Sequence, residues 1–236
     1  MTLKELSKTW EDTEVFHKNI NDTFAEKVNG VEWLREHRKF VTANAFGFGE
    51  NCFHWLWKLL VDEMPSEFSF LEIGIFRGQV LSLMKMLASS TGRSVTRYGV
   101  SPLSNADGHW YSDYAEDIKT IHNKFFIPQD YTIYQGLSTE PEIIEQAKKT
   151  APYDILYIDG GHTLDVVTSD FKHYAPMVKR GGYLVVDDCN NEMNMPFGFF
   201  QGIAPVTQAK MEYMKQHPND WEFVFSVVHI SVFRKK

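Results

Sequence analysis

The sequence contains few cysteines and no long apolar run, and each of these absences excludes a class of protein. Cys52 and Cys189 are the only cysteines, and their flanking residues form no pair with metal-ligand spacing. Two free thiols are typical of a reducing compartment, which predicts a cytoplasmic location. The first 15 residues hold no apolar stretch of signal-peptide type, and no run approaches the roughly 20 apolar residues that cross a bilayer. We therefore expect a soluble protein with no membrane partner.

Positive charge is also scarce. The chain carries 24 lysines and arginines against 31 aspartates and glutamates, a formal net charge of -7, and no basic stripe stands out. An extended polyphosphate would be repelled by such a surface, so the composition argues against a nucleic-acid partner. With 236 residues, 43% of them hydrophobic, and no repeat or linker, the chain is expected to form one domain over residues 1–236.

Two patterns divide the chain near Met64. Before it, apolar residues recur at helical spacing, which predicts a helical N-terminal extension over residues 1–64, interrupted by a glycine-containing loop at 44–51. From 65 to 236, short apolar runs alternate with helical segments, as in parallel strands joined by right-handed crossovers. The end of the chain, WEFVFSVVHISVFRKK, holds two β-rich runs with no helix between them and predicts an antiparallel hairpin. We expect an α/β fold, a doubly wound and mostly parallel seven-stranded sheet of Rossmann-like type.

Ligands bind such sheets beyond the carboxyl ends of the strands, so the residues that follow each strand matter most. After the first strand, residues 71–78 read LEIGIFRG, where a glycine turn lets backbone N–H groups approach a ligand. A dinucleotide fingerprint would need glycine at 74, 76 and 79, but Phe76 and Gln79 occupy two of these positions. The turn therefore argues against a nicotinamide cofactor. It either binds another ligand or has a structural role only.

The fourth and fifth strands end in acidic residues. The fourth is followed by DGGH at residues 159–162, and the fifth by Asp187 and Asp188. Neighbouring strands lie about 4.8 Å apart, so the carboxylates of Asp159, Asp187 and Asp188 can converge at one edge of the sheet. They would repel one another there unless a cation lay among them, and Mg2+ or another hard divalent cation with oxygen ligands fits that need. Taken singly, each aspartate is explained equally well as a helix cap or turn residue.

These patterns resemble a known family. The spacing Glu72-x-Gly74-x-x-x-Gly78 resembles the first motif of class I S-adenosylmethionine-dependent methyltransferases. The segments IDGGHTLDVVTSD and GGYLVVDD look like those of the metal-dependent O-methyltransferases, the group that contains macrocin O-methyltransferase and cephalosporin hydroxylase-like proteins. The similarity covers about residues 70–188. It implies a class I methyltransferase fold, methylation of a hydroxyl on a sugar or small-molecule natural product, and assembly into homo-oligomers.

The resemblance also implies a role for each residue at the strand ends. It implies that Asp159, Asp187 and Asp188 bind the metal and that His162 is the general base. The chemistry agrees, because a hydroxyl bound to a cation loses its proton readily and an imidazole that titrates near neutrality can accept it. The residues implied to bind S-adenosylmethionine are Glu72, Gly74, Gly78, Ser101, Gln135, Gly136, Ser138 and Asp159.

Four polar residues either depart from the family pattern or have simpler explanations. Ser101 stands where the family commonly has an acidic residue for the ribose hydroxyls, although a serine still offers a hydrogen bond. Ser138 or Thr139 would equally serve to cap the helix that Pro141 opens. Asp170, on the helix after the fourth strand, is expected to face solvent or to bond locally, outside the site.

The acceptor cannot be read from these residues. The loop 44–51 and the segments 104–114 and 189–214 are expected to form parts of an acceptor pocket over the catalytic edge, although packing against the sheet would explain their aromatic residues equally well. Two other functions stay open. One is a nicotinamide-dependent oxidoreductase on a related sheet, and the other is a catalytically silent protein that binds a cofactor.

Overall fold

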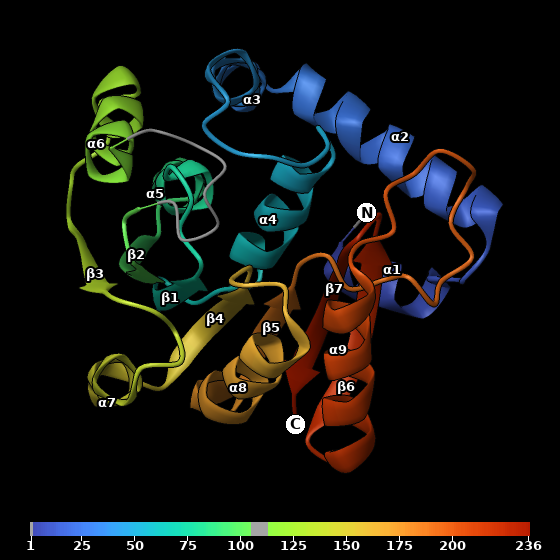
Figure 1. The fold of residues 1–236 in the computed structure, drawn as a ribbon. Helices are drawn as coiled ribbons and strands as arrows, with labels where there is room; N and C mark the ends of the chain where they lie inside the picture. Colours follow the sequence, from blue (N-terminus) through green and yellow to red (C-terminus); the bar gives the residue numbers. More distant parts are fainter. Residues whose placement is uncertain (1, 105–112) are drawn as a thin grey trace.

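The computed structural model describes residues 2–104 and 113–236, which form a sheet with helices on both faces (Figure 1). The helices are α1 (Leu3–Thr9), α2 (Glu14–Gly30), α3 (Glu32–Asn44), α4 (Phe53–Asp62), α5 (Gln79–Ser90), α6 (Tyr114–Lys124), α7 (Pro141–Thr150), α8 (Leu164–Tyr174), the short 3-10 helix η1 (Ala175–Met177) and α9 (Ala204–Gln216). The strands are β1 (Glu67–Ile73), β2 (Ser94–Ser101), β3 (Tyr131–Gln135), β4 (Tyr153–Ile158), β5 (Val178–Val186), β6 (Trp221–Val227) and β7 (Ile230–Lys235).

The strand order in the described part of the chain is β3-β2-β1-β4-β5-β7-β6. Strands β1 to β5 run parallel, whereas β7 is antiparallel to both β5 and β6. The predicted seven-stranded, mostly parallel sheet and its terminal hairpin are therefore confirmed. Because β2 and β3 extend the sheet on one side of β1 and β4 begins the other side, the order reverses between β1 and β4, where open α/β sheets bind their ligands.

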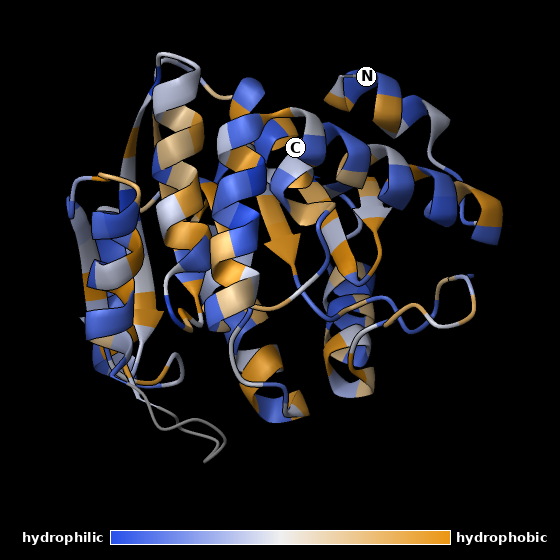
Figure 2. Ribbon diagram, turned by 90° about the horizontal axis from the view of Figure 1, so that it is seen from above, coloured by the Kyte–Doolittle hydropathy of each residue, from blue (hydrophilic) through white to orange (hydrophobic). Residues whose placement is uncertain are grey.

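The central strands are apolar because both of their faces are covered. All residues of β4 except Asp154 are buried, and so are the last five residues of β5. Viewed from above, these strands lie as apolar segments between helices whose outer faces are polar (Figure 2). Parallel sheets covered by helices require such runs, since neither face of the strand meets water.

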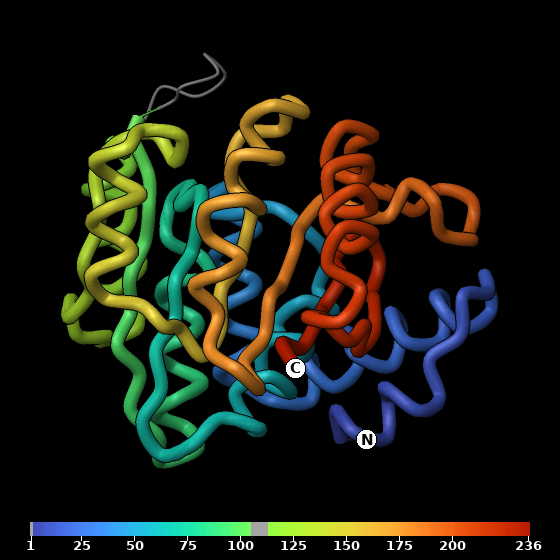
Figure 3. Tube along the Cα trace, turned by 90° about the horizontal axis from the view of Figure 1, so that it is seen from below, coloured from blue at the N-terminus to red at the C-terminus, as the bar shows by residue number. Residues whose placement is uncertain are grey.

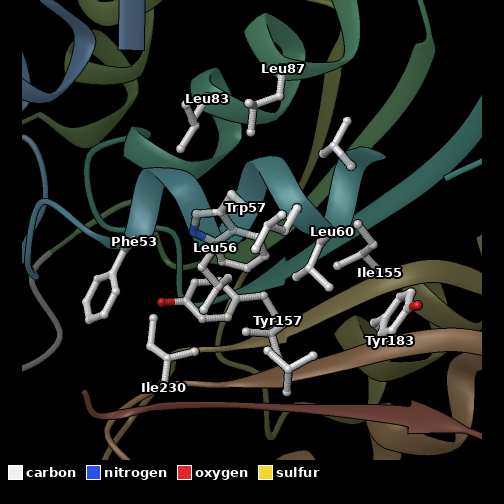
Figure 4. Packing of buried hydrophobic residues seen from close by; sticks show 14 of the residues in the cluster. Phe53, Leu56, Trp57, Leu60, Leu83, Leu87, Ile155, Tyr157, Tyr183 and Ile230 are labelled. Atoms are coloured by element: carbon white, nitrogen blue, oxygen red, sulfur yellow. The ribbon is translucent and has the colours of Figure 1, made fainter. Parts of the chain in front are cut away.

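The two faces carry different helices. One face packs against the N-terminal helices α1 to α4 and α5, in a cluster that includes Phe24, Trp57 and Leu83. Helix α4 lies across the sheet in Figure 4, with Trp57 directed toward Tyr157 of β4. The other face is covered by α7, α8 and α9, which lie in front in Figure 3 and contribute Ile143, among others, to a second cluster. Helices α1 to α4 thus form much of one layer.

The two cysteines are free, as the sequence predicts, and the structure shows that both are buried. Burial raises the pKa of the Cys52 thiol well above its usual value and that of Cys189 to about 11. Both thiols are therefore protonated and unreactive at neutral pH. Separately, no helix among the described residues combines the length and the apolar character that a membrane crossing requires.

Candidate active site

Strands β4 and β5 bring two of the predicted acidic residues side by side. Ile158 and Val186, the last residues of these strands, are paired, so Asp159 and Asp187 come next on adjacent strands. The backbone N–H of Asp187 donates to the carbonyl of Ile158 over 3.0 Å, which holds the two ends together. Asp188 then adopts a left-handed backbone with φ of 51°, a conformation that aspartate tolerates better than most residues. The chain turns there while keeping both carboxylates at the same edge.

Tyr157 joins two of these carboxylates. Side chains alternate along a strand, so Tyr157 and Asp159 share a face of β4. The tyrosine hydroxyl lies 3.1 Å from Asp159 Oδ2 and also donates to Asp187 Oδ2. Its ring packs beneath Trp57 while its oxygen points toward the Phe53 end of α4 (Figure 4). A hydroxyl has one hydrogen, so Tyr157 can donate to only one carboxylate at a time and a net negative charge remains.

Burial raises the pKa of all three carboxyl groups. For Asp159 the pKa is raised well above its usual value, by burial first and then by the charges of Asp187 and Asp188. The pKa values of Asp187 and Asp188 are raised to about 6, again mainly by burial. Carboxyl groups gathered in this way favour a proton or a cation among them.

Two histidines contact the acidic edge from different sides. Nε2 of His162 lies 3.3 Å from Asp188 Oδ2, and its side chain is 43% exposed. Nε2 of His229, in the turn between β6 and β7, lies 3.2 Å from Asp187 Oδ1 and 3.7 Å from Asp188 Oδ1, and its side chain is only 7% exposed. Burial lowers the pKa of His229, against the opposing charges of Glu50 and Asp188. Asp188 therefore lies between one imidazole open to solvent and one enclosed by protein.

A pocket of about 470 Å³ opens onto these groups. The residues 46–50 line it, as does Phe200, so two of the three segments expected around an acceptor border the same cavity as the aspartates. In the third segment, 104–114, residues 105–112 lie outside the described residues. Pockets of this size bind small molecules.

The turn between β1 and α5 depends on its glycines. Gly74 has φ of 96°, and a Cβ at this position would lie 1.9 Å from the backbone oxygen of Asp159. Gly78 has φ of 90° and precedes the first residue of α5. Glu72 lines the pocket with its carboxyl group buried, and burial raises its pKa to about 8. Of these three residues, all predicted to bind the cofactor, Glu72 and Gly74 lie close to Asp159.

The other predicted cofactor residues lie farther along the same edge. Ser101 pairs with Gln135 at the ends of β2 and β3, and the backbone N–H of Gly136 donates to the Ser101 carbonyl. The Ser101 hydroxyl donates to the carbonyl of Ile75 over 2.9 Å, and this hydrogen bond stabilises the turn that begins at Gly74. The carbonyl of Ser138 accepts from the hydroxyl of Tyr174.

The comparisons with known proteins decide the family. Residues 71–189, half of the chain, match the methyltransferase domain family. The chain belongs to this family. A relative, an uncharacterized protein of Acanthamoeba polyphaga mimivirus, is 31% identical over 153 residues, which cover 64% of this chain and 65% of the relative.

Solved structures show the same methyltransferase fold. The O-methyltransferase NovP has a TM-score of 0.55 and 16% identity, covering 78% of this chain and 79% of its own. MycE, from the mycinamycin pathway and in complex with Mg, SAH and mycinamycin VI, has a TM-score of 0.55 and 17% identity, covering 85% of this chain and 53% of its own. TomG of Streptomyces achromogenes, in complex with SAM, has a TM-score of 0.54 and 14% identity, covering 81% and 82%. At such identities the likeness concerns the fold.

Two expectations about polar residues of this methyltransferase domain are wrong. Asp170 is fully buried, and burial raises its pKa to about 7 against the effect of a hydrogen bond from the side chain of Ser138. The reason is that α8 packs onto the sheet beneath Gly160, where a Cβ would come within 3.1 Å of Asp170 Oδ2. Helix α7 does begin at Pro141, but its cap is Glu140 without a side-chain hydrogen bond, so neither Ser138 nor Thr139 caps it.

Three residues of the site were not anticipated from the sequence. Tyr157 could have been found from strand alternation, since it lies two residues before Asp159. The sequence predicts Glu50 only as a residue of the loop 44–51. His229 carries no local signal at all, because its position depends on how the terminal hairpin meets β5: its carbonyl accepts from the backbone N–H of Cys189 over 2.9 Å.

Proposed function

We propose that this protein is an S-adenosylmethionine-dependent O-methyltransferase that methylates a hydroxyl of a small molecule or sugar with the help of a divalent cation. The observation that carries the proposal is a pair of clusters that share Asp188 at the carboxyl edge of a methyltransferase sheet. One joins Asp188 to Asp159 and His162, and the other joins it to Asp187 and His229. Among the structures with this fold, TomG binds SAM and MycE binds Mg together with SAH. The carboxylates of Asp159, Asp187 and Asp188 in this chain offer the oxygen donors that such an ion prefers.

The residues present fit both groups. Asp159, Asp187 and Asp188 would hold the cation, which would offset the burial that raises their pKa values and the charge repulsion at Asp159 and Asp188. Gly74 and Gly78 leave the backbone of the turn open to the donor, and Glu72 faces the same pocket. When bound, the donor supplies a sulfonium methyl group and the cation polarises the acceptor oxygen.

The chain itself supplies positioning and proton transfer. His162 presents Nε2 at the acidic edge, is exposed enough to exchange a proton with water, and would take the acceptor's proton. The aromatic residues Phe46 and Phe200 border the pocket and would hold the acceptor against the edge. A vicinal pair of hydroxyls would suit such a site, because both oxygens could bind one ion.

Ligand-induced stabilisation tests the cofactor. S-adenosylmethionine and SAH are expected to raise the Tm of the metal-free protein, whereas NAD is not, since only a ligand that binds the native state stabilises it. A shift with NAD and none with S-adenosylmethionine would favour the oxidoreductase alternative.

Methyl transfer tests catalysis. We expect formation of SAH from S-adenosylmethionine with vicinal-diol acceptors, stimulated by Mg2+ and abolished in Asp187→Ala, because that variant lacks one of the three carboxylates. Glu212→Ala, on the outer surface of α9, is the control for an unrelated lost carboxylate. Turnover that Asp187→Ala leaves intact would show that the acidic edge does not serve the reaction.

A further inference from the structure

The buried histidine of the terminal hairpin lies where a metal ligand would lie. The structure assigns His229 as a ligand of the divalent cation, through Nε2, and with it a preference of the site for first-row transition ions such as Mn2+, Co2+ or Zn2+ over Mg2+. This inference rests on the cation site of the function proposed above and changes which ion that site selects.

The distances suit a common ion. Nε2 of His229 and single carboxylate oxygens of Asp187 and Asp188 all lie within 4.8 Å of one another, and the contacts of Nε2 with the two oxygens are 3.2 and 3.7 Å. Ligand atoms that each lie about 2.1 Å from an ion are separated by roughly 3.0–3.6 Å, depending on the coordination geometry. Only small adjustments would be needed to place one ion among the three atoms.

In one of the two tautomers of His229, an ion suits the contacts better than a direct contact does. Nδ1 of His229 faces Oε2 of Glu50 at 3.6 Å, and Nε2 faces Asp187. Neither Nδ1 nor Glu50 Oε2, both buried, has a hydrogen-bond partner at normal distance and angle among the described residues, and the backbone of Phe200 also interacts with the ring. A neutral imidazole has one N–H for these two carboxyl groups. With that hydrogen on Nδ1, the lone pair of Nε2 points at carboxylate oxygens, which is repulsive unless a cation lies between them.

The arrangement is the one that metal-binding histidines generally show. Such a histidine donates its second ring N–H to a carboxylate, which fixes the tautomer and the orientation of the ring. A small shift of Glu50 Oε2, which lies 3.6 Å from Nδ1, would make it that carboxylate. The ring of His229 is also held by edge contacts with Phe53 and Phe200, at centroid distances of 4.8 and 5.0 Å.

The two histidines of the edge therefore differ in role. A ligand benefits from a fixed, enclosed ring, as at His229, whereas a base must exchange protons with solvent, as the 43% exposed His162 can. Carboxylates alone suit Mg2+, and an added imidazole shifts the preference toward transition ions, whose affinities rise from Mn2+ toward Cu2+.

Metal titration without turnover tests the assignment. Metal-free wild type, His229→Gln and His162→Gln would be titrated with Co2+ and with Mg2+ by calorimetry, and the visible absorption spectrum of bound Co2+ recorded. We expect His229→Gln to weaken Co2+ binding by at least about 10- to 100-fold and to shift the Co2+ bands, as loss of a nitrogen ligand requires. Mg2+ affinity should change by less than about threefold. His162→Gln, the matched control at the same edge, should leave the Co2+ spectrum unchanged.

The outcomes separate the two proposals. Equal Co2+ affinity and an unchanged spectrum in His229→Gln would overturn the assignment of His229 while leaving the cation site in place. Failure of wild type to bind either ion would overturn the cation site itself and this inference with it. If His229→Gln does not fold, Glu50→Gln gives the second test, since loss of the carboxylate at Nδ1 should weaken Co2+ about tenfold or more.

Discussion

Two pairs of histidines occupy opposite surroundings in this molecule. His37 and His54 meet inside the helical layer, where both are fully buried. His162 and His229 face aspartates at the carboxyl edge of the sheet. The same side chain thus serves as a neutral packing element in one region and as a group opposed to negative charge in the other, and its neighbours decide which.

The helical pair forms a chain of hydrogen bonds, and burial lowers the pKa of both rings so that they are neutral. His54 Nε2 and His37 Nδ1 are 2.8 Å apart, and His37 Nε2 lies 3.0 Å from the Ser82 hydroxyl. That hydroxyl donates to the carbonyl of Gln79, so it accepts from His37, and His37 in turn accepts from His54. Since Gln79 begins α5, the chain joins the N-terminal helices to the helix that follows the glycine turn.

The largest expected effect separates the pairs by activity. His162→Gln should lower the rate of methyl transfer by about 10²- to 10⁴-fold, as loss of a general base does. Its free energy of unfolding in urea should change by less than about 0.5 kcal/mol, since the side chain is exposed. His54→Gln should do the reverse, losing about 1–3 kcal/mol of stability with little change in rate per folded molecule. The comparison fails if both variants lose activity to the same extent.

A smaller effect is expected from Ser82→Ala. This substitution leaves the N–H of His37 Nε2 buried without an acceptor, which costs about 1–3 kcal/mol in the free energy of unfolding, measured with urea. Ser169→Ala on α8 is a suitable control, because its hydroxyl contacts the partly exposed His173. Equal stability of the two serine variants would mean that the histidine chain is not oriented as inferred.

Much of this architecture follows from local patterns. Alternating apolar runs and helical segments predict the parallel sheet, and the consecutive β-rich runs at the end predict the hairpin. The carboxyl ends of adjacent strands must lie at one edge, which is why Asp159 and Asp187 could be placed together from the sequence. The need for glycine at position 74 is predictable as well. The tight turn after β1 passes so close to the backbone of Asp159, at the end of β4, that no side chain fits there.

What the sequence does not predict depends on tertiary packing. His229 reaches the site because a hairpin distant in sequence docks beside β5, and no periodicity encodes that contact. Asp170 falls in a polar gap of an amphipathic pattern, yet α8 lies so close to the sheet that the carboxyl group is buried. The histidine pair of the helical layer joins α3 to α4, two helices whose relative packing the apolar spacing leaves open.

The pH dependence of stability gives the smallest and most specific test. Burial lowers the pKa of His37 to about 3 and that of His54 well below its usual value. Histidine in an unfolded chain titrates near pH 6.5, at about the value for a free side chain. Below that pH the two histidines are protonated in the unfolded chain, whereas the buried rings of His37 and His54 stay neutral in the native protein. The free energy of unfolding should therefore fall as the pH falls from about 6.5 toward 3, by up to about 1.4 kcal/mol per pH unit for each histidine.

The aspartates of the acidic edge change the free energy of unfolding with pH in the opposite direction. The test therefore compares wild type with His54→Gln. Because the pKa values of Asp187 and Asp188 are raised to about 6, the native state holds extra protons over the range below that value. Their contribution is common to wild type and His54→Gln, so it cancels in the difference. The free energy of unfolding would be measured with urea in metal-free buffer between about pH 6 and 5. Its slope against pH should be smaller in His54→Gln than in wild type, by the amount that corresponds to about one proton. Identical slopes would mean that His54 is protonated in the native state, and the contrast between the two pairs would not hold.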